Sequence, residues 1–106
     1  MTELDINIEL AKSLGYEYTV ENQGFKLFVY INGLKFDPCN NINQAWVLML
    51  DHDISVTKTS NDTFIGLHCL GSRYNNFDNE NLCCDDWVED KKPLVAAMKT
   101  ILKIRS

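Results

Sequence analysis

Residues 25–36 read FKLFVYINGLKF, and this stretch predicts a β-hairpin. Asn32-Gly33 is the strongest short signal for a two-residue hairpin turn, because both residues accept a positive φ. Before the turn, residues 25–31 place apolar side chains on both faces of a strand, which normally requires cover on both sides. The short strand 34–36 follows the turn and ends at Asp37-Pro38, since proline cannot donate a ladder hydrogen bond.

Three amphipathic helices are predicted around the strands. The first spans residues 2–14, with a core stripe of Leu4, Ile8, Ala11 and Leu14. The second begins after Asn40 or Asn41, and its apolar stripe assigns Trp46 to the core together with Ile42, Ala45, Met49 and Leu50. The last begins at residues 91–93 and presents Leu94, Ala97, Met98, Ile101 and Leu102.

Further strands are predicted over residues 16–20, 54–58 and 63–70, with a short strand or helical turn near residues 84–88. The element order is therefore α-β-β-(β)-α-β-β-α. We expect an α/β chain of the α+β type with one domain over residues 1–106. Its predicted architecture is an antiparallel sheet of four to five strands with helices on both faces.

Three segments of this chain resemble the phage ABA sandwich domain family. They are residues 9–16 (ELAKSLGY), 36–46 (FDPCNNINQAW) and 96–102 (AAMKTIL). The chain departs from the family pattern at Asn40 and Asn41, where the family tends to have Ser and Asp, and in its long acidic stretch before the last helix. The resemblance implies an α-β-α sandwich and a phage origin. It implies no established activity, and no catalytic residue is carried over from it.

The composition of the 106 residues, 45% hydrophobic and 24% charged, is that of an ordinary globular domain. No apolar run is long enough to span a bilayer, and residues 1–5 are acidic, unlike a signal peptide. We therefore expect a protein of the host cytoplasm with reduced cysteines and no membrane partner. The scattered basic residues and the net charge of −5 argue against direct binding to nucleic acid.

The net charge comes from one segment, residues 78–90, which holds six acids and no base. Of the fifteen acids in the chain, nine remain elsewhere against ten bases. Trp87 lies within the segment, either as an anchor onto the domain or as an exposed interface residue. The segment predicts a surface for a basic protein partner, with a solvated loop as the alternative. The predicted partner-binding residues are Tyr74, Phe77, Asp78, Glu80, Asp85, Asp86, Trp87, Glu89 and Asp90.

No residue pattern predicts a catalytic, cofactor or metal site. His52 lies between two aspartates at a helix end, where adjacent side chains point apart. His68 and Cys69 are neighbours in a strand and face opposite sides of the sheet. Cys83-Cys84 lies among carboxylates, which raise a thiol pKa and oppose nucleophilic use. We predict that the protein is not an enzyme.

Three functions are compatible with these features. The first is a phage-type accessory protein that inhibits a host nucleic-acid-handling or defence protein, as anti-CRISPR or anti-restriction proteins do, by occupying a basic channel. The second is a nucleotide-signal binder or sponge, for which Asn40-Asn41 and Asn75-Asn76 with Arg73 are the candidate residues. The third is a homo-oligomeric structural or accessory phage protein, paired through strand edges or the face that carries Tyr16 and Tyr18.

Overall fold

A computed structural model describes residues 1–68 and 86–106, which form three helices and six strands. The elements are α1 (Glu3–Ser13), β1 (Thr19–Gln23), β2 (Lys26–Ile31), β3 (Leu34–Phe36), α2 (Ile42–His52), β4 (Ile54–Lys58), β5 (Phe64–His68), β6 (Asp86–Asp90) and α3 (Pro93–Arg105). The strands make two antiparallel three-stranded sheets, ordered β1-β2-β3 and β4-β5-β6. The predicted α+β class is thus confirmed, but the prediction of one sheet of four to five strands is wrong.

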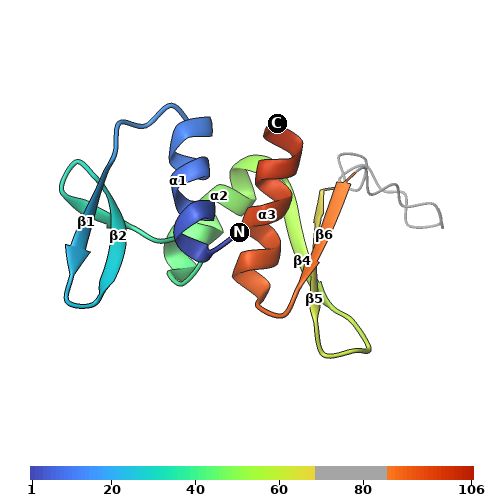
Figure 1. The fold of residues 1–106 in the computed structure, drawn as a ribbon. Helices are drawn as coiled ribbons and strands as arrows, with labels where there is room; N and C mark the ends of the chain where they lie inside the picture. Colours follow the sequence, from blue (N-terminus) through green and yellow to red (C-terminus); the bar gives the residue numbers. More distant parts are fainter. Residues whose placement is uncertain (69–85) are drawn as a thin grey trace.

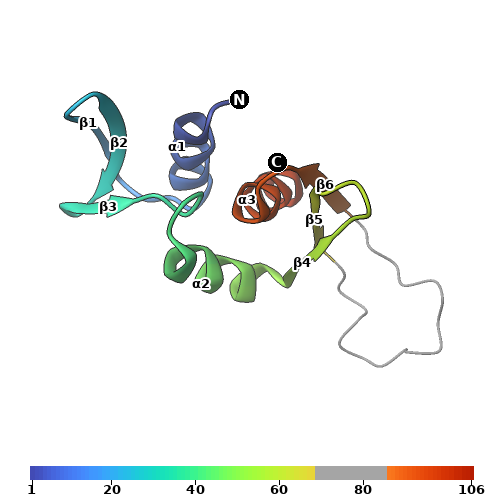
Figure 2. The same ribbon diagram turned by 90° about the horizontal axis from the view of Figure 1, so that it is seen from below.

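The helices form the middle layer, and the two sheets lie on either side of it (Figure 1). The predicted layer order had helices on both faces of one sheet, so the arrangement is reversed. Figure 2 shows the same separation from below, with α2 and α3 between the β1–β3 sheet and the β4–β6 sheet. Each sheet therefore uses one face to close the core, and the opposite face is turned away from the helices.

The outward side chains of β2 explain why this sheet is stable with helices packed against only one of its faces. Val29 is fully buried, whereas its neighbours Phe28 and Tyr30 are only half-buried on the other face. Lys35 of β3 lies opposite Tyr30, and its Nζ is 3.9 Å from the centre of the Phe28 ring. Lysine thus covers the aromatic face from within the sheet while its charge stays in water.

The hairpin between β2 and β3 turns where the sequence predicts. Ile31 pairs with Leu34, and the two turn residues, Asn32 and Gly33, have φ values of 55° and 80°. Positive φ at both central positions is the type I′ turn that matches the strand twist. The first strand of this sheet lies further along the chain than predicted: the prediction spans residues 16–20, whereas β1 spans 19–23.

The β4–β6 sheet packs on α3 through small side chains. Gly66 lies in the middle of β5, and Thr100 of α3 donates a 3.0 Å hydrogen bond from its Oγ1 to the Gly66 carbonyl oxygen. The absence of a side chain at Gly66 lets the helix approach this closely. The fifth predicted strand, 63–70, begins one residue later than expected, at Phe64, and its predicted last two residues lie outside the described residues. Residues 86–90 form a strand, one of the two alternatives predicted there.

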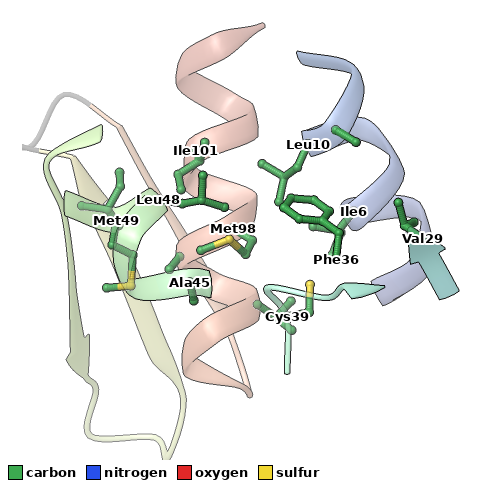
Figure 3. Close-up of a cluster of buried hydrophobic side chains, with 14 residues drawn as sticks. Ile6, Leu10, Val29, Phe36, Cys39, Ala45, Leu48, Met49, Met98 and Ile101 are labelled. Atoms are coloured by element: carbon green, nitrogen blue, oxygen red, sulfur yellow. The ribbon is translucent and has the colours of Figure 1, made fainter. Parts of the chain in front are cut away.

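The core centres on α3, which contacts α1, α2 and each strand of the β4–β6 sheet. Figure 3 shows the cluster of buried side chains around it. Met98 and Ile101 point from α3 toward residues of α1 and α2, and both are fully buried. The α1 side of the cluster is closed by Ile6, Leu10, Val29 and Phe36, and the α2 side by Ala45, Leu48 and Met49. The stripe predicted for α3 is confirmed at Ala97, Met98 and Ile101, while Leu94 and Leu102 are only partly buried. Val95, Ala96 and Thr100 are buried as well, because α3 also packs on the β4–β6 sheet.

Helix α2 buries a different face from the predicted one. Ala45, Leu48 and Met49 face the core, whereas Trp46 is 55% exposed and Ile42 and Leu50 are more exposed still. The assignment of Trp46 to the core is thus wrong. Residues 45–50 are all apolar, so helical spacing fits several faces equally well, and packing against α3 selects one of them.

Among the described residues, no helix is long and apolar enough to cross a membrane.

Candidate functional site

Strand β6 carries the part of the predicted acidic site that the structure describes. Its burial alternates, so Asp86, Val88 and Asp90 turn toward α3 while Trp87 and Glu89 turn away from it. Trp87 is 51% exposed and lies opposite Leu67 of β5, and Glu89 lies opposite Ile65. We call this surface the outer face; it consists of Thr57, Ile65, Leu67, Trp87 and Glu89.

The two inward carboxylates of β6 form ion pairs with α3. Asp90 accepts a 2.8 Å hydrogen bond from Lys99 Nζ, and Asp86 Oδ1 lies 3.9 Å from Lys103 Nζ. Partial burial would raise the pKa of Asp90, but the hydrogen bonds from Lys99 and from the backbone N–H of Lys92 outweigh it and lower that pKa. These carboxylates therefore join β6 to α3, and lysine charges lie beside them.

Glu89 is fixed at the edge of the outer face. It accepts a hydrogen bond from the hydroxyl of Thr63, whose Oγ1 is also 2.7 Å from the Oγ1 of Thr59. Both threonines belong to the connection between β4 and β5. The carboxylate is exposed and ordered by this chain of hydroxyls, so it presents a negative charge beside Trp87.

The acidic site is thus brought together only in part. Asp86, Trp87, Glu89 and Asp90 lie on one strand but on two opposite faces. The other predicted partner-binding residues lie outside the described residues: Tyr74, Phe77, Asp78, Glu80 and Asp85. The cysteines at 69, 83 and 84 and the Arg73, Asn75 and Asn76 group also fall outside them.

His52 has a structural role at the end of α2. Its Nδ1 is 2.8 Å from the Leu48 carbonyl oxygen, and its Nε2 is 3.1 Å from a guanidinium nitrogen of Arg105. Arg105 also donates to the side chain and carbonyl oxygen of Ser13, so the contact joins α1, α2 and α3. Since both ring nitrogens have partners, His52 is not placed as a general base.

Cys39 lies in the core with only 3% of its surface exposed, and the acidic residues Glu3 and Asp37 are nearby. Desolvation, with a further contribution from these carboxylates, raises the pKa of the Cys39 thiol to about 12. Such a thiol stays protonated at neutral pH and is not a nucleophile.

Asn40 and Asn41, the amides proposed for nucleotide binding, form hydrogen bonds within the protein. Asn41 caps α2, because its side-chain oxygen accepts hydrogen bonds from the backbone N–H groups of Asn43 and Gln44. Asn40 donates to Glu3 at 2.9 Å and to Asp37 at 3.2 Å.

His68 is half-buried opposite Asp86. Within residues 1–68 and 86–106, no group of three or more His, Cys, Asp or Glu side chains could hold a metal ion.

A second exposed apolar surface was missed by the sequence reasoning. Beside α2 lies a hollow of about 460 Å³, lined by Leu34 and Phe36 on one side and by Asn43 and Val47 on the other. We call the adjoining surface the α2 face; it consists of Leu34, Ile42, Trp46, Val47 and Leu50, each more than half exposed. The available signal was the absence of any charged residue from 38 to 50, so that no charge marks the exposed side of α2.

Comparison with known proteins adds no relative: no family model, curated protein or solved structure matches this chain. The resemblance to the phage ABA sandwich family therefore stays a prediction.

Proposed function

We propose that this protein is a non-enzymatic binding protein that inhibits a host nucleic-acid-handling or defence protein through the outer face. The observation that carries the proposal is Trp87, a large apolar side chain that is half exposed on the same face of β6 as Glu89. Tryptophan is the residue most enriched among those that dominate binding energy. Trp87 belongs to the edge strand β6 and lies beside Leu67 of the middle strand β5.

The surroundings of Trp87 fit the centre of a protein interface. Leu67 and Ile65 of β5 are partly buried beside it, and the polar residues Thr57 and Glu89 lie around them. An apolar centre with a polar rim excludes water from the contact and is the common anatomy of such sites. A sheet of three strands is a firm support for this surface, because backbone hydrogen bonds fix the side-chain positions.

Charge supports a basic partner, with a narrower set of residues than the sequence indicates. Glu89 faces outward. Asp86 and Asp90 have lysines beside them, so they contribute less to the negative electrostatic potential at the outer face. Asp78, Glu80 and Asp85 precede β6 in the sequence and bring three further negative charges to this part of the chain. Such charges speed association with a basic nucleic-acid channel and make it salt-dependent. The host and the phage origin rest on the family resemblance, and the cytoplasmic location is the expectation drawn above from the sequence.

Quantitative capture from host lysate tests the proposal. The wild-type chain is compared with Trp87→Ala and with Trp46→Ala, a matched control that removes an equally exposed tryptophan from another surface. We expect wild type and Trp46→Ala to retain the same basic protein and Trp87→Ala to lose it, with all three variants equally folded. Equal capture by Trp87→Ala would reject the outer face as the binding surface.

A further inference from the structure

The α2 face is more apolar than the surface of a monomer requires. Ile42, Trp46 and Leu50 are 63%, 55% and 61% exposed, and Val47 is also exposed beside them. Burial of these side chains would be favourable, because apolar surface gains free energy when it leaves water. The core of this protein covers only the side of α2 with Ala45, Leu48 and Met49, so the other apolar residues of the helix are left in contact with water.

The area of this surface is enough for one half of a small interface. Ordinary side-chain areas and the exposed fractions give roughly 600 Å² for the five residues, at the upper limit of an apolar patch on a monomer. Two such patches would bury on the order of 1,200 Å², which is the lower limit for specific protein–protein interfaces. The polar residues at the edge, Asn43 and Asp51, would add to this area.

The spacing of the exposed residues is symmetric about Trp46. Ile42 precedes it by one turn and Leu50 follows it by one turn, so both flanking positions carry a branched aliphatic side chain. In an antiparallel pair of identical helices crossing at Trp46, Ile42 of each copy meets Leu50 of the other. Residues four apart form one ridge, and packing such ridges together is the commonest way for helices to cross.

The absence of charge on the α2 face allows a second copy to bind there. The chain carries a net charge of −5, so two copies repel each other wherever their acidic surfaces meet. The α2 face avoids this repulsion because residues 38–50 hold no charge. In the antiparallel arrangement, the exposed Asp51 at the end of one helix comes near the amino terminus of the other, where a negative charge is favourable.

We infer that the protein forms a two-fold symmetric homodimer through the α2 face, with antiparallel α2 helices that cross at Trp46. This surface is separate from the outer face, so the inference does not depend on the proposed function.

The oligomeric state tests the inference directly. Light scattering coupled to size-exclusion chromatography should give twice the chain mass for wild type at about 100 μM. Trp46→Lys should weaken the dimer by at least about tenfold, as loss of a central interface tryptophan does. Trp87→Lys is the matched control and should remain a dimer. A wild-type monomer, or a Trp46→Lys protein that dimerises as tightly as wild type, overturns the inference.

Mixing experiments test the antiparallel arrangement. Ile42→Lys and Leu50→Glu should each be monomeric, because each places unpaired charges in the apolar contact. Their mixture should dimerise, since the new lysine of one chain meets the new glutamate of the other. A mixture of Ile42→Lys with Ile42→Glu should stay monomeric, because position 42 does not meet itself. Dimerisation of this second mixture alone would overturn the antiparallel arrangement.

Discussion

Gly66 of β5 lies directly against the backbone of Ala96 in α3. A Cβ atom at Gly66 would be 2.6 Å from the Ala96 carbonyl oxygen and 2.6 Å from Thr100 Oγ1. These distances are too short for real contacts, so α3 can rest on the β4–β6 sheet only because residue 66 has no side chain. The contact positions β6, and with it Trp87 and Glu89, relative to the helical layer.

Gly66→Ala should therefore destabilise the protein. The helix and the sheet must separate to admit the methyl group, and such overpacking costs about 1–3 kcal/mol. Urea unfolding measures the change in the free energy of unfolding. Ser55→Ala, at an exposed position on neighbouring β4, is the control and should stay within about 0.5 kcal/mol of wild type. A Gly66→Ala protein as stable as wild type would show that α3 does not approach the sheet this closely.

Two substitutions in the helical layer should differ strongly in their effect. Met98→Ala removes a fully buried side chain from the core and should lower the free energy of unfolding by about 2–5 kcal/mol. Trp46→Ala removes a larger side chain, yet in the dilute protein it should cost less than about 1 kcal/mol because that side chain is on the surface. Denaturant unfolding at low micromolar concentration separates this folding effect from dimerisation. A large loss for Trp46→Ala under these conditions would place Trp46 in the core after all.

Stability should fall as the solution becomes acidic. The hydrogen bond from Lys92 Nζ, 2.6 Å long, and that from Asn40 hold the pKa of Glu3 below its usual value. Desolvation acts to raise the pKa of Asp90, but the hydrogen bonds from Lys99 and from the backbone N–H of Lys92 outweigh it and lower that pKa. A carboxyl with a lowered folded-state pKa contributes stability above its unfolded pKa and loses it as the pH falls through the folded value. We expect a plateau above about pH 5 and a decline below about pH 4.5.

The control for this pH dependence is Asp90→Asn, measured with wild type from pH 3 to pH 6. The difference in stability between the two proteins should be largest on the plateau and shrink as the pH falls, because Asp90 is then protonated in both the folded and unfolded states. A difference that stays constant over this range would show that the ionised form of Asp90 makes no special contribution.

Cys39 should resist alkylation in the folded protein. Its thiol is buried and its pKa is raised to about 12, so little thiolate forms at pH 8. Iodoacetamide labelling followed by peptide mass spectrometry should show Cys39 modified at least about tenfold more slowly in buffer than in urea. Rapid labelling in buffer would mean that this part of the core opens readily.

The sequence predicted an element correctly where its residue pattern fits only one backbone conformation or one buried face. Asn32-Gly33 predicted the β2–β3 turn because few backbones accept positive φ at two successive residues. The stripe of α3 was correct at Ala97, Met98 and Ile101, because Lys99 and Lys103 mark the exposed side, but it missed Val95, Ala96 and Thr100, which are also buried. In α2, residues 45–50 carry no such polar marker, so the buried face was wrong.

The division into two sheets could not be read from the sequence for a similar reason. Apolar residues on both faces of β2 and β5 indicated cover on both sides, but a lysine covers Phe28. On β5, the outer residue Leu67 lies beside Trp87 from the next strand. The alternation of β6, which turns Trp87 and Glu89 outward, became visible only with its pairing to β5, because its mostly charged sequence does not mark a buried face.

Affinity for the captured host protein is the most direct test of the outer face as a binding site. We expect Trp87→Ala to weaken binding by about 30-fold or more, as an interface hot spot does, while its melting temperature remains within about 2 °C of wild type. Wild-type binding should also weaken steeply as salt is raised, because the partner is basic. Binding by Trp87→Ala that equals wild type, or that is lost only together with the fold, would contradict the proposal.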